Sequence, residues 1–113
     1  MEFNINTKGN ASILELKGSL LADVQSKEIL QNVTDLIQEG NVNFIVDLNE
    51  LKFINSSGLG MLLTGLTKAR KAGGDMFLAN VPEQVSNLLV ITKLSSIFTT
   101  VDTVEEGLRQ LSA

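Results

Sequence analysis

The sequence predicts an α/β layered fold with a mixed, mostly parallel sheet of about five strands and four helices. Segments with a two-residue or continuous apolar pattern alternate along the chain with segments that repeat every 3.6 residues. One segment, 42–48, is almost continuously apolar, which is typical of a strand covered by helices on both faces. Right-handed crossovers should connect the parallel strands.

The chain is expected to begin with a β-hairpin. In 2–8, Phe3 and Ile5 alternate with polar residues, which predicts a half-buried strand. Gly9-Asn10 is a turn signal. We therefore expect 11–18 to form a second strand, antiparallel to the first and ending at Gly18.

A helix is predicted over 23–39 because its apolar residues fall on one helical face. Asp23 or Ser26 is the expected cap, and Gly40 should end the helix. The residues on the apolar face are Ile29, Leu30, Val33, Leu36 and Ile37.

The next predicted strand, 42–48, contains one acid, Asp47. Two interpretations are open for it. Asp47 is either a functional acid directed at the site that follows, or an acceptor of backbone hydrogen bonds in the next loop. We expect 51–54 to be that loop, with its apolar side chains covering the end of the sheet; the alternative is that an exposed part of it serves a partner protein.

A second helix is predicted over 57–72, closed by Gly73-Gly74. Gly65 inside it indicates close approach of another surface, either the sheet or a partner. Basic residues cluster near the end of this helix. We interpret them as cations that interact favourably with the negative end of the helix dipole, in preference to a nucleic-acid-binding cluster. These basic residues are Lys68, Arg70 and Lys71.

The last third is expected to add a strand at 76–81, a helix at 83–91, a short strand at 98–101 and a helix at 103–112. Pro82 fits the first turn of the third helix. Thr103 and Glu106 have the spacing of a capping box for the last helix. No linker or internal repeat interrupts the chain, so 1–113 should form a single domain.

Composition excludes several functions. The net charge of −4 argues against a nucleic-acid binder. The chain has no Cys and no His, so no Ser-His-Asp triad, Cys-His pair or His-based metal site can form. The start lacks the features of a signal peptide, and no apolar run approaches the ~18 residues of a membrane span. We expect a cytoplasmic protein without membrane insertion, catalytic residues, cofactor or metal.

The segment 53–60, Phe-Ile-Asn-Ser-Ser-Gly-Leu-Gly, connects the central strand to the second helix. The start of a helix offers unpaired N–H groups and the positive end of the dipole. Such a position suits an anion, or a hydroxyl that becomes one. One hydroxyl of Ser56 or Ser57 is expected to cap the helix. A phosphate-binding loop is not indicated, since Gly58-Leu59-Gly60 lacks the following Lys.

This segment resembles the Asp-Ser-Ser-Gly-Leu-Gly motif of STAS domains, the family of anti-sigma factor antagonists. The resemblance implies a STAS-like layered fold and a binding protein that is not an enzyme. It implies that an anti-sigma factor serine kinase phosphorylates Ser57, that phosphorylation abolishes binding to that partner, and that a serine phosphatase reverses it. The implied partner-binding switch loop consists of Asn55, Ser56, Ser57, Gly58, Leu59 and Gly60, together with Asp23.

Two positions differ from the family pattern. Asn55 replaces the leading acid, and Leu21 follows Gly18-Ser19-Leu20 where the family usually has an acid, so that Asp23 is the nearest one. In the family both acids belong to the phosphorylation and partner-binding surface. The alternative function is therefore a constitutive STAS module, never phosphorylated, that serves as a scaffold or a transporter-associated subunit.

Overall fold

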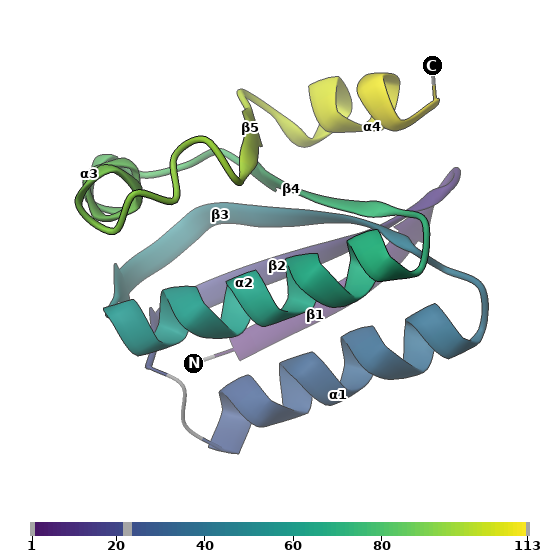
Figure 1. The fold of residues 1–113 in the computed structure, drawn as a ribbon, viewed down its shortest axis with the longest axis horizontal. Helices are drawn as coiled ribbons and strands as arrows, with labels where there is room; N and C mark the ends of the chain where they lie inside the picture. Colours follow the sequence, from purple (N-terminus) through teal and green to yellow (C-terminus); the bar gives the residue numbers. More distant parts are fainter. Residues whose placement is uncertain (1, 22–23, 113) are drawn as a thin grey trace.

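The computed structural model describes residues 2–21 and 24–112 and contains five strands and four helices within them. Figure 1 shows these elements as a layered α/β domain. In chain order they are β1 (Glu2–Lys8), β2 (Ala11–Leu20), α1 (Val24–Gln38), β3 (Asn43–Ile54), α2 (Ser56–Lys71), β4 (Asp75–Ala79), α3 (Glu83–Ile91), β5 (Thr99–Val101) and α4 (Val104–Ser112).

The sheet has the order β1-β2-β3-β4-β5. β1 and β2 form the predicted antiparallel hairpin, and every other neighbouring pair is parallel. Gly9 has a φ of 58°, which supplies the positive φ that a tight hairpin turn requires. The predicted mixed, mostly parallel sheet is confirmed, with β3 at its centre.

Helices cover both faces of the sheet. α1 and α2 lie on one face and α4 on the other (Figure 1), so the apolar residues separate into two clusters. Leu14, Val46 and Leu62 belong to the cluster beneath α1 and α2. Ile45 and Phe77 belong to the smaller cluster beneath α4. Alternate residues of β3 therefore enter different cores, which explains its nearly continuous apolar run.

The predicted loop at 51–54 is wrong, because β3 continues as a strand to Ile54. The cause is two irregularities in its pairing with β2. Glu15 pairs with Asp47 but Lys17 pairs with Glu50, so β3 carries an extra residue there, and a second extra residue precedes Phe53. Such bulges disturb the two-residue pattern. β2 likewise continues past the predicted end at Gly18 to Leu20.

Contacts within the domain decide between the sheet and a partner at Gly65, and the position of Ser26 excludes it as the cap of α1. A Cβ placed on Gly65 would lie 3.0 Å from Cε of Met76 in β4, so this glycine permits approach to the sheet. Ser26 is a buried residue inside α1 and therefore does not cap it, and Asp23 lies outside the described residues. At α4, Oγ1 of Thr103 accepts a hydrogen bond from the N–H of Glu106 at 3.1 Å, as predicted.

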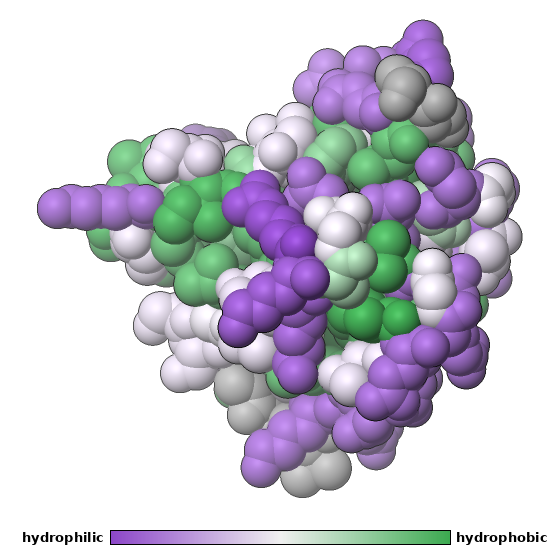
Figure 2. All heavy atoms as spheres, turned by 45° about the vertical axis from the view of Figure 1, so that its right-hand side comes forward, coloured by the Kyte–Doolittle hydropathy of each residue, from purple (hydrophilic) through white to green (hydrophobic). Residues whose placement is uncertain are grey.

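The surface is mostly polar. Figure 2 shows apolar patches on one side of the molecule that are separated by hydrophilic side chains. In the described part of the chain, the large apolar side chains that remain exposed are Leu21, Phe53, Val90, Ile91 and Ile97.

Candidate functional site

The candidate site lies where β3 leads directly into α2. Asn55 is the single residue between the two elements and has an extended backbone, with φ −105° and ψ 175°. Its side-chain Oδ1 accepts a hydrogen bond from the N–H of Gly58 at 2.7 Å, and its carbonyl accepts one from the N–H of Leu59 at 3.0 Å. This arrangement is an N-cap that fixes the first turn of α2.

The expectation that a serine caps this helix is therefore wrong. Both serines lie inside the first turn of α2, one residue or more beyond the cap position. Asn is as good a capping residue as Ser, and it occupies the last extended position before the helix. The signal was present in the sequence, because Asn55 comes directly after the apolar strand.

Capping by Asn55 leaves both hydroxyl side chains exposed. Ser56 and Ser57 are accessible to solvent at the start of α2, as was expected of Ser57. Gly58 and Leu59 are buried, and Gly60 is half-buried. Of the predicted switch loop, the serines therefore form the accessible surface, while Gly58 and Leu59 shape the turn beneath them.

Close packing against β2 explains the glycine that follows the serines. The N–H of Asn55 donates to the carbonyl of Leu20 at 3.4 Å. A Cβ placed on Gly58 would overlap the same carbonyl oxygen. Backbone does not move away as a flexible side chain can, so this position requires glycine.

Two exposed apolar side chains lie at the same end of the sheet as the start of α2. Leu21, which follows β2, is 41% exposed, and Phe53 of β3 is 49% exposed. Leu20 pairs with Ile54, so both side chains lie at the same end of the sheet as Asn55. The sequence indicates Leu21 as a departure from the family pattern, and it leaves open that an exposed part of 51–54, which contains Phe53, serves a partner. Asp23, the remaining predicted residue of this surface, lies outside the described residues.

The electrostatic environment at the serines suits an anion. The first turn of α2 contains no acidic residue, so the positive end of the dipole is not neutralised there. The basic residues of this helix lie in its last turn, at the opposite end, as the dipole favours. Negative charge added at Ser56 or Ser57 would therefore be tolerated by the helix itself.

Asp47 takes no part in this site. Its Oδ1 accepts hydrogen bonds from the N–H of Asn49 at 3.1 Å and from Nδ2 of Asn80 at 2.9 Å. Of the two interpretations, the structure supports the acceptor of backbone hydrogen bonds. The carboxylate holds the first bulge of β3 and ties β3 to the residue that follows β4.

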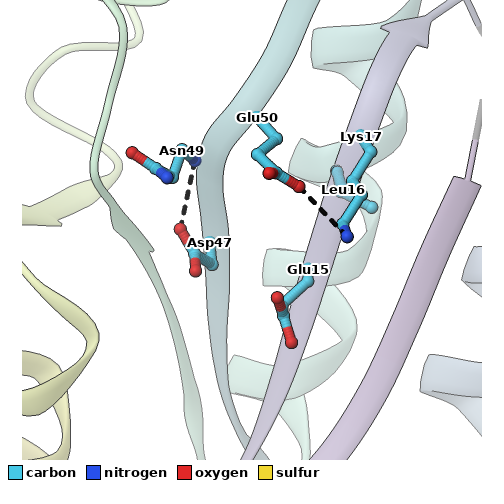
Figure 3. Close-up of a pocket in the computed structure, with 6 residues that line it drawn as sticks. All are labelled: Glu15, Leu16, Lys17, Asp47, Asn49 and Glu50. Carbon is cyan, nitrogen blue, oxygen red and sulfur yellow. Dashed lines mark hydrogen bonds and ion pairs between the residues drawn. The ribbon is translucent and has the colours of Figure 1, made fainter.

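Asp47 also borders a polar hollow of about 180 Å³ on the sheet surface, shown in Figure 3. There Lys17 of β2 points toward Glu50 of β3, and Nζ lies 3.1 Å from Oε2. The hydrogen bond and charge of Glu50 raise the pKa of Lys17 above its usual value of 10.5, with smaller contributions from Glu15 and Glu2. The hollow is a surface charge cluster, separate from the serines.

In residues 2–21 and 24–112, no three or more His, Cys, Asp or Glu side chains are grouped so that they could hold a metal ion. Within the same residues, no helix has both the length and the apolar character needed to cross a membrane.

This geometry agrees with the comparisons with known proteins. The STAS domain family matches residues 2–107, and the chain belongs to this family. Among its relatives, the anti-sigma-B factor antagonist of Bacillus subtilis is 26% identical over 97 residues, which cover 86% of this chain and 89% of that protein.

Solved structures share the fold. A candidate anti-sigma factor antagonist from Thermotoga maritima superimposes with a TM-score of 0.88 at 22% identity, over 98% of this chain and 95% of the other. The Bacillus cell fate determinant SpoIIAA in its phosphorylated form has a TM-score of 0.77 at 20% identity, over 96% and 98% of the two chains. The predicted STAS-like fold is thereby confirmed.

Proposed function

We propose that this chain is an anti-sigma factor antagonist whose unphosphorylated form binds a kinase-type anti-sigma factor and thereby frees the sigma factor. Phosphorylation of Ser57 switches this binding off, and a serine phosphatase restores it. The observation that carries the proposal is the exposed serine pair at the asparagine-capped start of α2. Membership of the STAS family and the name of the Bacillus subtilis relative support it.

The chain would be a substrate of its partner and would supply no catalytic group. A phosphoacceptor needs only a reachable hydroxyl, because the kinase contributes the base and the metal. Oγ of Ser57 attacks the γ-phosphorus of ATP, the bond to ADP breaks, and the hydroxyl proton goes to the kinase base. The absence of His and Cys from the chain is compatible with this division of labour.

Phosphorylation would act on the partner surface and leave the fold intact. A phosphoserine adds about −1.5 to −2 charges at pH 7. The positive end of α2 accommodates that charge, since the first turn contains no acid. Leu21 and Phe53 are exposed at the same end of the sheet as the serines and would contact the partner through apolar surface. A phosphate at this end of the sheet would hinder that contact by charge and by bulk.

Phosphate mapping tests the proposal. The chain is incubated with a kinase-type anti-sigma factor from the same organism and with ATP, and the product is analysed by intact and peptide mass spectrometry. We expect a gain of one phosphoryl group on Ser57. Ser57→Ala should abolish that gain, while the matched control Ser56→Ala should retain it. Phosphate on Ser56, or none on either serine, contradicts the assignment.

A constitutive STAS module is the second candidate function, and two observations favour it. Asn55 provides the cap without the negative charge of the family's Asp, and Leu21 provides an apolar surface where the family has an acid. Such a module would bind its partner independently of phosphorylation. Co-purification of the wild-type chain and of Ser57→Asp with the same partner in equal yield would support this second function.

A further inference from the structure

The outer edge of β1 is open. Among residues 2–21 and 24–112, β1 is the first strand of the sheet order and pairs only with β2. In the described part of the chain, none of the backbone hydrogen bonds found outside the helices and ladders involves residues 2–8. The strand is seven residues long, pairs with β2 without a bulge and contains no proline. It therefore lacks two of the features that commonly protect edge strands.

The hairpin turn determines which backbone groups face outward. Lys8 and Ala11 flank the two-residue turn, so they form a hydrogen-bonded pair. Hydrogen-bonded and non-hydrogen-bonded pairs alternate in an antiparallel ladder. The N–H and C=O groups of Phe3, Ile5 and Thr7 consequently point away from β2, toward the open edge.

The charges on one face of this edge form an incomplete ladder. Glu50 on β3 lies opposite Lys17 on β2, and Lys17 lies opposite Glu2 on β1. The signs alternate across the sheet and end on a negative residue at the edge. Lys8, at the other end of β1, has no ion-pair partner among the described residues.

We propose that β1 is a self-association edge, at which a second copy of this chain pairs antiparallel about Ile5. In this register Ile5 of one copy lies opposite Ile5 of the other copy. Across the two copies, Phe3 lies opposite Thr7 and Glu2 lies opposite Lys8. The three outward-facing residues then form hydrogen-bonded pairs with each other. Each Lys8 completes the charge ladder of the other copy, which makes the edge complementary to itself.

The pairing register favours a second copy of this chain, over an unrelated strand, as the partner of the β1 edge. Sliding one copy by a single residue, so that the centre falls between two residues, would place outward-facing groups opposite inward-facing ones, and the hydrogen bonds would be lost. Centring on Asn4 keeps hydrogen bonds but removes the pairing of Glu2 with Lys8. Only pairing about Ile5 uses all seven residues and both charges.

Charge reversal with complementation tests this edge. Glu2→Lys and Lys8→Glu each place like charges opposite one another at both ends of the paired strands. Sedimentation velocity on the full chain, at protein concentrations up to about 1 mM, should show dimerisation. High concentrations are needed because small interfaces are weak. Each single variant should associate at least about tenfold more weakly. Mixing the two variants places Lys opposite Glu at both ends and should restore association, as a heterodimer visible by native mass spectrometry.

Matched controls carry the same charge changes outside β1. Glu39→Lys and Lys52→Glu change exposed residues and should dimerise like the wild type. Recovery of association in the mixture would show that the loss in a single variant is not caused by misfolding. A wild-type chain that stays monomeric, single variants that dimerise like the wild type, or a mixture that stays monomeric would each overturn the proposal.

Discussion

At the start of α2, one amide side chain replaces the hydroxyl cap that two adjacent serines suggest. Oδ1 of Asn55 satisfies the N–H of Gly58 and leaves Ser56 and Ser57 free to face solvent. The chemistry of this residue thus separates two roles. Asn55 stabilises the helix, and the serines are available for modification.

The cap is open to direct measurement. Asn55→Ala should lower the free energy of unfolding by about 0.5–2 kcal/mol, because the N–H of Gly58 loses its acceptor. Asn55→Asp keeps the acceptor and adds a charge favourable to the dipole, so its melting temperature should stay close to that of the wild type. Chemical denaturation and thermal melting of both variants check this. A loss of several kcal/mol in Asn55→Asp would mean that the amide is needed for a buried contact.

Two glycines in the same turn provide a matched pair. Gly58→Ala should destabilise by about 1–3 kcal/mol, since its Cβ would overlap the backbone of Leu20. Gly60→Ala meets no atom within 4 Å and should stabilise the helix by up to about 1 kcal/mol. Urea denaturation of the two variants measures the difference. Equal effects would show that the turn does not pack against β2 as described.

At the scale of the element, the sequence predicted the presence and type of every strand and helix, because periodicity survives in a single sequence. It did not predict the full length of β3. The bulges around Asn49 and Lys52 place polar residues where the two-residue pattern expects apolar ones, so the strand was taken for a loop. Pairing register depends on the partner strand and cannot be read from one segment alone. For the same reason, the sequence could not show which side chain of 51–54 would be exposed.

The charge pair between β2 and β3 makes a pH-dependent contribution. Because Glu50 raises the pKa of Lys17 in the folded state, the unfolded chain loses this proton first as pH rises. The stabilisation is present below about pH 10.5 and is lost as pH rises through the folded-state pKa. It should be small, since both side chains are exposed and screened.

Lys17→Gln isolates this contribution. The stability difference between wild type and Lys17→Gln should be constant from pH 8 to pH 10 and should shrink above that range. Lys52→Gln, an exposed lysine of β3, serves as the control. Urea denaturation over this pH series gives the measurement. A difference that grows with rising pH would contradict the assigned direction of the shift.

For the whole molecule, the layered fold presents the start of α2 at the end of the sheet where β3 finishes and α3 lies (Figure 1). Gln84 of α3 donates to the carbonyl of Lys52 at 2.5 Å and helps to fix this end. The site therefore rests on rigid elements, and a phosphate added there should change the surface without rearranging the core. The sequence predicted this location through its serine motif and contained the signal for the cap at Asn55, whereas the exposure of Phe53 at this end of the sheet required the three-dimensional arrangement.

The central claim is that the charge state of Ser57 controls partner binding, and one titration tests it most directly. Isothermal calorimetry would compare unphosphorylated and enzymatically phosphorylated chain against the kinase-type anti-sigma factor, with circular dichroism of both forms. We expect unphosphorylated chain and Ser57→Ala to bind alike, Ser57→Asp to bind more weakly, and phosphorylated chain to lose at least about 100-fold in affinity with unchanged dichroism. Equal affinity of the phosphorylated and unphosphorylated forms would contradict the switch.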